Sequence, residues 1–497
     1  MHMGARSRRR HPEFSRARSR LVGRPRAVHE AGVTANRPPR PGPRPRPRPD
    51  NKPGLLPAAD ASAGPAADPS DNPGAGGLTA RSAALDLVRA AMARRAGLDE
   101  GMNHPSWKRL KPQDRAFARA LAMATLRNLG RINRALEGKL KKRPPDPVME
   151  LLRVGAAQLV ALEVPDFAAV ATTVKLSERS SDTRPYKGLI NAVLRGLIRD
   201  GGIGAPAEAS LPPWLWERWK ATFGDADARS IAEAVIVEPP TDLSLKPGQD
   251  VQAWADKLEA EPLPGGGLRV RRRGDLALWP GFETGEWWVQ DAAAAVPARL
   301  TGAAPGMAIA DLCAAPGGKT LQLCAAGAAV TAVDRSPQRL KRLHDNLARA
   351  GLTAEVIAAD AEAWDDPRTF DAVLLDAPCS ATGTFRRNPE VLWGARPAEI
   401  AKLADVQHRL LDAAAARVKP GGVLVYCVCS LEREEGETQA IAFVRRHPDF
   451  RMEPIDPEGC GAPAEAARPE GWLRILPGYW TDRGGVDGFF VARFQRG

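Results

Sequence analysis

Two cysteines in the last third of the chain stand where thiol chemistry is expected. Cys379 follows Asp376 in DAPCSATGTF, and Cys429 follows Cys427 in VYCVCS. Each segment begins with a short apolar run typical of a buried strand, so each thiol should lie close to the end of a strand. A thiolate is a strong nucleophile, and two thiols at neighbouring strand ends favour covalent catalysis over inert packing.

Acidic residues follow strand-like segments at four places, Asp311, Asp334, Asp360 and Asp376. The segment DLCAAPGGKT, which begins at Asp311, has small residues that let backbone amides approach a ligand closely. Asp334 lies 23 residues beyond Asp311, which suits a carboxylate that accepts hydrogen bonds from ribose hydroxyls. Because buried carboxylates need donors to offset desolvation, these acids indicate a nucleoside-containing cofactor.

The end of the same segment, GGKT, also resembles the end of a phosphate-binding loop. That loop requires a glycine where this sequence has Cys313, and acids at four strand ends suit ribose and adenine better than a triphosphate. We therefore prefer a nucleoside cofactor to nucleotide hydrolysis.

The elements that must position these residues alternate between strand and helix after residue 286. Strands are expected at 307–312, 329–334, 353–360, 370–378 and 421–430, with helices beginning near 319 and 338 and a third over 398–418. This alternation predicts a mainly parallel, doubly wound α/β sheet over 286–497, with ligands bound at the carboxyl ends of the strands. The segments WLRILP and GFFVARF should close one edge of it.

Three regions precede this sheet. Residues 1–76 are rich in Arg, Pro, Ala and Gly, and we expect them to be disordered. Residues 77–203 show helical periodicity at 80–96, 115–136, 147–162 and 186–200, which predicts an all-α domain. Residues 204–285 combine an aromatic helix, whose tryptophans should fill a domain seam, with strand-like segments at 241–247, 265–274 and 276–281. They predict a small α+β unit.

Charge and composition exclude several classes of protein. The formal net charge is +12, but residues 1–50 hold 14 Arg and three acids, so residues 51–497 carry only +1. Attraction to a polyanion must therefore come from the tail and from local patches such as Arg386 with Arg387.

No apolar run approaches the roughly 20 residues of a membrane span. The six cysteines and seven histidines lack metal-ligand spacing, so we expect no metal and a reducing, cytoplasmic location.

The motifs resemble those of the RsmB-type RNA cytosine-5 methyltransferases. The resemblance rests on DLCAAPGGKT, VDRSPQRL, DAPCSATGTFRRNP, YCVCSLEREEGE and GVDGFFVARF, while FETGEWWVQD, DRAFARAL and GLINAVLRG extend it upstream. It covers residues 78–497. It implies a Rossmann-like class I methyltransferase sheet, preceded by an all-α NusB-like domain and a small α+β, RRM-like subdomain, both of which would bind RNA.

The resemblance also implies roles for individual residues. S-adenosylmethionine would be bound by Cys313, Ala314, Ala315, Pro316, Gly317, Gly318, Lys319, Asp334, Asp360 and Asp376. Cys429 would add to carbon 6 of cytosine, making carbon 5 nucleophilic enough to accept a methyl group. Cys379 would help to release the product. Lys319 is a neighbouring cation that favours the thiolate, and Asp376, if burial keeps it protonated, could donate to ring nitrogen 3.

The chain departs from the family pattern beside the expected nucleophile. The family's Y-S-T-C-S is replaced by Tyr426, Cys427, Val428, Cys429 and Ser430, and its E-E-N-E has Gly436 at the third position. Strand alternation should point Cys427 and Cys429 to the same face, so geometry alone does not choose between them. Alignment with the motif favours Cys429.

The substrate implied by this resemblance is an unstacked cytosine in folded RNA, because carbon 6 is accessible only when the base leaves its stack. Likeness to bacterial members makes 16S ribosomal RNA the leading target, with transfer RNA as an alternative, and Arg386 and Arg387 could position the RNA. A noncatalytic RNA-binding assembly factor is the competing class, but its expected sign, a missing thiol or a broken cofactor loop, is not seen. We expect the protein to act as a monomer.

Overall fold

A computed structural model of the chain describes residues 73–93, 98, 101–102, 105–162, 164–272 and 274–497. The tail predicted to be disordered lies outside the described residues up to residue 72. None of the helices in these ranges is long and apolar enough to cross a membrane.

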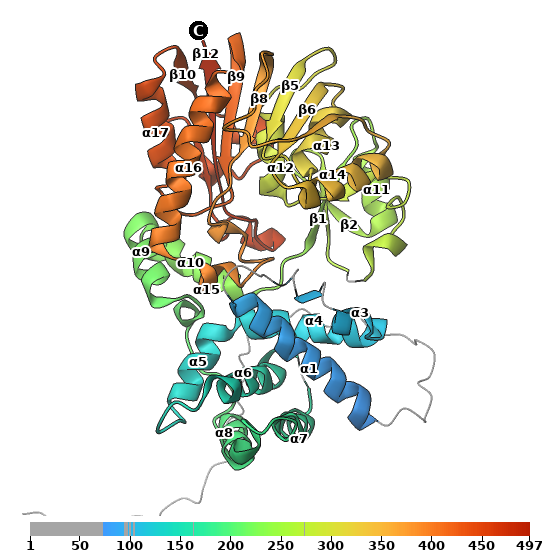
Figure 1. Ribbon diagram of the computed structural model, residues 1–497, viewed down its shortest axis with the longest axis vertical. Coiled ribbons are helices and arrows are strands. Elements are labelled where there is room, and N and C mark those ends of the chain that lie inside the picture. Colours follow the sequence, from blue (N-terminus) through green and yellow to red (C-terminus); the bar gives the residue numbers. More distant parts are fainter. Residues whose placement is uncertain (1–72, 94–97, 99–100, 103–104, 163, 273) are drawn as a thin grey trace, which may run out of the picture. The chain divides into compact units, whose positions relative to one another are not determined.

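The first described region is entirely helical, as predicted (Figure 1). Its helices are α1 (Pro73–Met92), α3 (Pro105–Lys108), α4 (Pro112–Arg127), α5 (Leu129–Glu137), α6 (Asp146–Ala161), α7 (Asp166–Ser177) and α8 (Lys187–Arg199). Leucine, valine and alanine side chains from α1, α4, α6 and α8 form one buried cluster. At Gly155 of α6, an added Cβ would lie 2.9 Å from a Leu194 side-chain carbon and 3.0 Å from Thr173, so glycine permits the close packing of α6 on α7 and α8.

The single helix predicted over 115–136 is divided into α4 and α5. Asn128 ends α4, where its side-chain amide donates to the carbonyl oxygen of Ala124 at 3.0 Å. The helical periodicity continues on both sides of this residue, so the sequence pattern conceals the break. Asn commonly interrupts helices in this way because its side chain competes for backbone groups.

A small antiparallel sheet follows, in the order β2-β3-β1-β4. Its strands are β1 (Thr241–Leu245), β2 (Ala260–Leu263), β3 (Gly267–Val270) and β4 (Trp287–Val289), and α11 (Val251–Leu258) packs against it. The strand predicted at 276–281 is wrong, because Leu276–Leu278 forms a 3-10 turn. β4 extends the sheet beyond residue 285, since buried Trp287 pairs with Leu245 of β1.

Two helices upstream of this sheet pack elsewhere. α9 (Pro213–Phe223) and α10 (Asp225–Ile236) share a buried cluster with Phe385 and Leu431 of the large α/β region. The ring of Trp219 stacks on Phe385 with centroids 6.2 Å apart. The prediction that these tryptophans fill a seam is therefore confirmed for Trp219.

The large sheet has the order β10-β12-β9-β8-β5-β6-β7, with β11 paired to β12 (Figure 1). Its strands are β5 (Ala308–Leu312), β6 (Ala329–Asp334), β7 (Glu355–Ala358), β8 (Phe370–Asp376), β9 (Val418–Val428), β10 (Phe450–Glu453), β11 (Leu473–Ile475) and β12 (Phe489–Arg496). β7, β6, β5, β8 and β9 are mutually parallel, whereas β12 runs antiparallel to β9 and β10. The predicted doubly wound sheet is confirmed.

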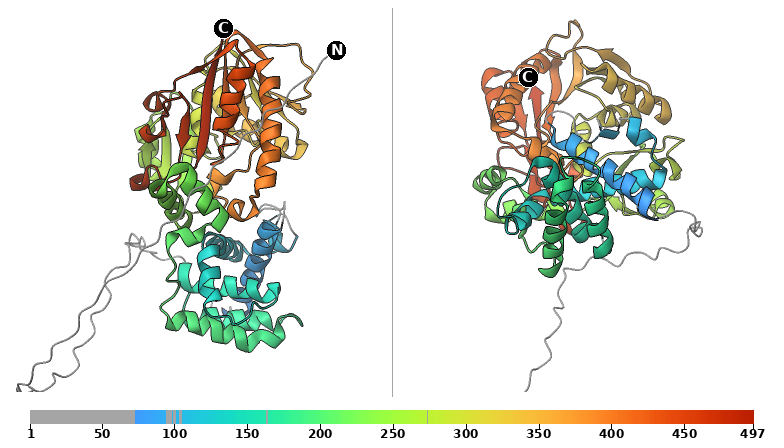
Figure 2. Two further views of the ribbon diagram at one scale, coloured as in Figure 1. Left: turned by 90° about the vertical axis from the view of Figure 1, so that its left-hand side faces the viewer. Right: turned by 60° about the horizontal axis from the view of Figure 1, so that its bottom comes forward.

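Helices cover both faces of this sheet. α16 (Pro397–Ala415) and α17 (Glu437–Arg446) pack on one face, against Val373 and Leu424 (Figures 1 and 2). α12 (Ala292–Arg299), α13 (Gly318–Ala325) and α14 (Pro337–Ala350) cover the other. Because both faces are covered, the parallel strands are mainly apolar between their ends, and the predicted site residues lie at or after the strand ends.

A buried network of charges joins the small sheet to the large one. Arg269 of β3 donates two hydrogen bonds of 2.7 Å to Asp242 of β1, and both side chains are fully buried. Arg387 lies 2.6 Å from Asp291 and 3.6 Å from Asp242, while Asp487 pairs with Arg387 at 3.4 Å. The alternation of arginines and carboxylates compensates each buried charge.

Replacing Arg269 by leucine should lower the free energy of unfolding by about 3 kcal/mol, because the Asp242 carboxylate would lose its bidentate buried partner. Urea unfolding monitored by tryptophan fluorescence measures this loss. The matched control is Arg451→Leu, since the Arg451 side chain is 76% exposed, and it should change the free energy by less than about 0.5 kcal/mol. Equal stability of the two variants would contradict the structural role of the network.

Candidate active site

The predicted site residues converge on the carboxyl edge of the parallel strands. β8 and β9 pair in register with Asp376 opposite Cys427, so the segments that follow both strands leave the sheet together. β5 and β8 are also adjacent, which brings the loop after β5 beside Asp376. The topology thus assembles the loops that contain Cys313, Cys379 and Cys429.

The loop between β5 and α13 has an unusual backbone. Cys313 has a φ of 62° and Gly317 a φ of 107°, and an added Cβ at Gly317 would lie 2.2 Å from a Leu343 side-chain carbon. Asp334 fixes the loop, because its carboxylate accepts a hydrogen bond of 3.2 Å from the Ala315 backbone amide. This tight turn leads directly into the first residues of α13, whose amide groups suit an electron-rich ligand.

Asp334 and Asp360 occupy different environments although both follow strands. Asp334 is 2% exposed and accepts hydrogen bonds from the Ala315 and Ser336 amides, with Arg339 3.3 Å away. Asp360 is exposed and accepts from the backbone amide of Glu362. Asp334 therefore braces the loop after β5, whereas Asp360 is open to solvent.

Asp311 is a buried acid beneath the same loop. One oxygen accepts a hydrogen bond of 2.6 Å from the Thr320 hydroxyl, while the other has no hydrogen-bond partner within the described residues. Burial raises the pKa of Asp311 to about 7, although the Thr320 hydroxyl and the Lys319 charge oppose the rise. Asp311 is thus a buried acceptor that titrates close to neutrality.

Lys319, Asp376 and Cys427 form a continuous polar chain. The Lys319 ammonium lies 2.7 Å from one Asp376 oxygen, and the Cys427 thiol donates to the other at 3.4 Å. Although burial opposes its charge, Lys319 has a pKa above its ordinary value because Asp376 stabilises the ammonium. The Asp376 side chain is 32% exposed. Both oxygens of Asp376 therefore accept hydrogen bonds, and donation from Asp376 to ring nitrogen 3 stays a prediction.

Cys427 is unsuited to act as a rival nucleophile. Its side chain is completely buried, and burial, followed by the Asp376 charge, raises its pKa well above the usual value. A thiol that stays protonated and donates to a carboxylate is a poor nucleophile. The structure therefore separates two cysteines that strand alternation alone could not distinguish.

Cys379 and Cys429 meet at the same edge, with their sulfur atoms 3.5 Å apart. The hydrogen bond to Cys429 and then burial raise the pKa of Cys379 well above its ordinary value, and the nearby Cys429 and Glu435 charges act in the same direction. The raised pKa favours the protonated form of Cys379, whose sulfur is in hydrogen-bond contact with the sulfur of Cys429. Both thiols are partly exposed, unlike Cys427.

A polar cluster that the sequence analysis missed lies behind the two thiols. Its members are buried or half-buried and join the segments after β8 and β9: Ser380, Thr382, Gln407, Ser430, Glu432 and Glu435. Glu432 also accepts a hydrogen bond of 3.0 Å from the Trp219 indole, which links α9 to the site. The signal in the sequence was the acid-rich run LEREEGE, which begins two residues after Cys429 and resembles a solvated surface segment.

The two arginines predicted to contact RNA have different surroundings. Arg386 is 1% exposed, pairs with Asp487 at 3.4 Å and donates to the Gly484 carbonyl oxygen, so the structure does not support an RNA contact. The Arg387 side chain is 26% exposed. It borders a hollow of about 270 Å³ together with Arg119 and Asn388.

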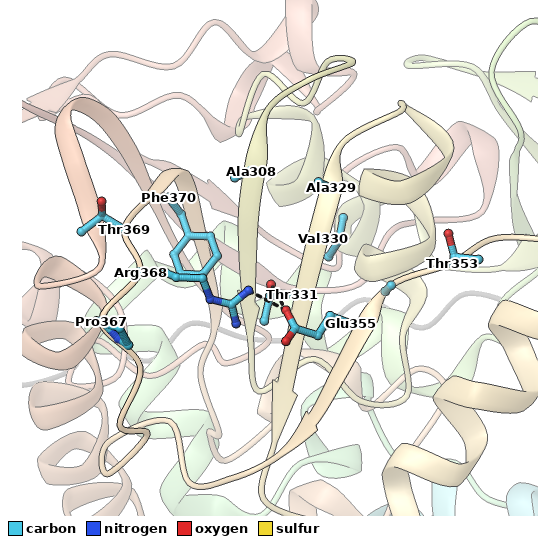
Figure 3. A pocket seen from close by; sticks show the side chains of 11 residues that line it. Ala308, Ala329, Val330, Thr331, Thr353, Glu355, Pro367, Arg368, Thr369 and Phe370 are labelled. Carbon is cyan, nitrogen blue, oxygen red and sulfur yellow. Dashed lines mark hydrogen bonds and ion pairs between the residues drawn. The ribbon is translucent and has the colours of Figure 1, made fainter.

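A larger hollow, of about 750 Å³, lies at the opposite edge of the sheet (Figure 3). It is lined by the first residues of the parallel strands, including Ala308, Ala329 and Phe370. Figure 3 shows Arg368 and Thr331 both directed at Glu355, which they contact at 2.7 and 2.9 Å. The amino ends of these strands carry none of the predicted site residues, so this hollow is distinct from the candidate active site.

The described residues contain no group of three or more histidine, cysteine, aspartate or glutamate side chains that could hold a metal ion.

Comparison with known proteins agrees with this geometry. A family model described as 16S rRNA methyltransferase RsmB/F matches residues 302–495, and a NusB family model matches residues 78–199. The chain is similar to ribosomal RNA small subunit methyltransferase B of Xylella fastidiosa strain 9a5c, at 38% identity over 77% of this chain and 91% of the relative. The enzyme of the same name from Vibrio cholerae is 36% identical over 78% and 90%, respectively.

Solved structures show the same fold. The crystal structure of PH0851 superposes with a TM-score of 0.69 and 25% identity, covering 84% of this chain and 99% of the other. NSun6 from Pyrococcus horikoshii, solved with SFG, gives a TM-score of 0.50 at 21% identity, covering 57% and 98%. The extent and identity of the curated matches show that the chain belongs to the RsmB/F family of 16S rRNA methyltransferases and carries a NusB-family domain.

Proposed function

We propose that this methyltransferase transfers a methyl group from S-adenosylmethionine to carbon 5 of a cytosine in 16S ribosomal RNA, through a covalent bond between Cys429 and the base. The observation that carries the proposal is the pair of sulfur atoms, Cys379 and Cys429, 3.5 Å apart beside the ion pair of Lys319 and Asp376. Two thiols within reach of one ring match a reaction that must both form and break a carbon–sulfur bond.

The loop after β5 fits S-adenosylmethionine, which would supply an electrophilic methyl group when bound. The residues that would hold it are Cys313, Ala314, Ala315, Pro316, Gly317, Gly318, Lys319, Asp334, Asp360 and Asp376. The free, buried oxygen of Asp311 supports this assignment, because the ammonium of an amino acid moiety would satisfy it. The glycines let the backbone approach a ligand without a side chain in between.

The chain's own residues would carry the reaction as follows. The Cys429 thiolate forms a bond to carbon 6, and the electron pair that this displaces activates carbon 5. Lys319 and Asp376 orient the base at its polar edge. After methylation the carbon-5 proton passes to solvent beside Cys379, and the electron pair left behind expels the Cys429 thiolate. Cys379 is suited to this step because a ring bonded to Cys429 must lie next to it.

The upstream regions would deliver the RNA. The NusB-family domain over 77–203 and the small α+β unit over 204–285 are proposed to bind the RNA in the cytoplasm, and the catalytic domain over 286–497 receives an unstacked cytosine. Of the predicted pair, Arg387 is the partly exposed arginine, but its guanidinium is paired with Asp291 and Asp487, so its contact with RNA stays a prediction. A single protein molecule would suffice for this arrangement.

Bisulfite sequencing of small-subunit ribosomal RNA tests the function directly. Deletion of the gene should remove 5-methylcytosine from one position, and the purified protein with S-adenosylmethionine should restore it. The control is the protein with Cys429→Ser. Unchanged methylation of 16S ribosomal RNA in the deletion strain would refute the proposed substrate.

The three cysteines should behave differently when each is replaced by serine. Cys429→Ser should reduce turnover at least 1,000-fold, because a hydroxyl is a far weaker nucleophile than a thiolate. Cys379→Ser should leave the protein covalently trapped on its RNA, visible as a shifted band in a denaturing gel. Cys427→Ser, which keeps a donor to Asp376, should retain activity within about threefold. If the Cys429→Ser variant were the one covalently trapped on RNA, the roles assigned to Cys379 and Cys429 would have to be exchanged.

Asp311→Asn should change the pH dependence of stability. The pKa of Asp311 is about 7 in the folded protein against 3.8 as its ordinary value. The folded state therefore binds the proton more tightly, so the wild type loses stability as the pH rises from about 4 to about 7, and the loss is complete above that range. Asparagine cannot lose a proton.

Relative to the wild type, this variant should gain up to about 4 kcal/mol in free energy of unfolding between pH 4 and pH 8. Urea unfolding at both pH values, without cofactor, measures the difference. Calorimetry at pH 8 should also show S-adenosylmethionine bound about tenfold more weakly, since a charged acceptor is lost. Parallel pH profiles for the two proteins would contradict the buried, titrating Asp311.

A further inference from the structure

One buried carboxylate, that of Glu435, lies between the two segments that carry the reactive thiols. Its first oxygen accepts hydrogen bonds from the Ser380 backbone amide at 2.8 Å and from Gln407 at 3.2 Å. Its second oxygen accepts from the hydroxyls of Ser380 and Ser430, both at 2.5 Å. Glu435 is fully buried, and four donors converge on it.

The two serines are the residues directly after the two thiols. Ser380 follows Cys379 and Ser430 follows Cys429, and the serine hydroxyls lie 3.0 Å apart. Any change in the distance between the serines must therefore be transmitted to the sulfur atoms, one residue away. The Glu435 backbone is fixed in turn, because its carbonyl oxygen accepts a hydrogen bond from the buried Tyr426 hydroxyl.

We propose that Glu435 is a positioning residue whose ionised carboxylate ties the two thiol segments together and directs the shared proton to Cys379, leaving Cys429 as the reactive sulfur. The inference rests on the proposed function, since it assigns Glu435 a task in the same reaction. An ionised carboxylate suits this position, because it only accepts and four groups donate to it.

Burial raises the pKa of Glu435, and the hydrogen bonds from Ser380, Ser430 and Gln407 oppose this rise by stabilising the carboxylate. The carboxylate charge acts on the thiols as well as on the backbone. It raises the pKa of Cys379, after the larger effects of the Cys429 hydrogen bond and of burial. Other charged or titratable groups also face this part of the site: Lys319, Asp376, Tyr426, Cys427, Glu432 and Arg474. The Glu435 carboxylate accepts hydrogen bonds from Ser380 and Ser430, the residues that directly follow Cys379 and Cys429.

Glu435→Gln tests the proposal without RNA, by alkylation of the folded, full-length protein with iodoacetamide. Mass spectrometry gives the rate at each cysteine between pH 6 and pH 9. In the wild type, Cys429 should react at least tenfold faster than Cys379 at pH 7.5. In the variant this ratio should fall to about two or less, because the amide can no longer accept all four hydrogen bonds or repel a thiolate at Cys379.

The matched control is Glu434→Gln, which makes the same chemical change one residue earlier, where the carboxylate pairs with Arg218 near the surface. It should keep the wild-type ratio of alkylation rates. Glu435→Asp keeps the charge on a shorter side chain and should recover at least a threefold preference for Cys429. An unchanged ratio in folded Glu435→Gln would overturn the proposal.

Kinetics give a second readout. Glu435→Gln should lower kcat about 100-fold and change the KM for RNA less than threefold, because it disturbs the reacting sulfurs and not the RNA-binding surface. Equal losses in kcat and in RNA affinity would point to a general structural defect and would also count against the proposal.

Serine variants cover the case in which Glu435→Gln does not fold. Ser380→Ala and Ser430→Ala each remove one donor and should each reduce the Cys429 preference at least threefold, with a combined effect smaller than the product, since both act through Glu435. Independent, multiplicative effects would overturn the proposal. These alkylation rates do not depend on methyl transfer, so a wild type that fails to methylate ribosomal RNA would refute the proposed function alone.

Discussion

The parallel pairing of β8 with β9 is the constraint on which the rest of the site depends. Because the two strands run in the same direction, Asp376 lies opposite Cys427, and the segments that follow carry Cys379 and Cys429 to a sulfur contact of 3.5 Å. A shift of one residue in this register would turn the polar side chains into the covered faces of the sheet. Covering helices on both faces leave the carboxyl edge as the place where polar groups can meet.

Buried charge is compensated wherever it supports this edge. Lys319 neutralises Asp376 between the loop after β5 and the end of β8, and Glu435 is held by four donors between the two thiol segments. Farther away, Arg269 and Arg387 pair with carboxylates that join the small sheet to the large domain. Such compensated groups fix geometry more than they add stability, because desolvation offsets much of their attraction.

Sequence periodicity predicted the main elements well and the irregular ones poorly. The strands of the parallel sheet are short apolar runs between turn residues, so their positions were readable, and the cysteines and strand-end acids could be assigned to one edge. By contrast, β2, β10 and α7 were not predicted, the segment 276–281 was taken for a strand, and the break at Asn128 was missed. The break at Asn128 and the turn at Leu276–Leu278 come from local side-chain hydrogen bonds that leave the apolar periodicity unchanged, whereas β10 is a strand because it pairs with β12, which is distant in sequence.

By itself, the sequence determined the class of chemistry and the edge of the sheet at which it occurs, because residue types, their spacing and strand direction are local properties. Only the tertiary structure decided what each side chain does there. It placed Cys427 against Asp376 as a buried donor, removed Arg386 from the surface into an ion pair, and set Glu435 between two loops about 50 residues apart. The physical reason is that burial and hydrogen-bond partners, which govern protonation and reactivity, are created only when distant segments pack together.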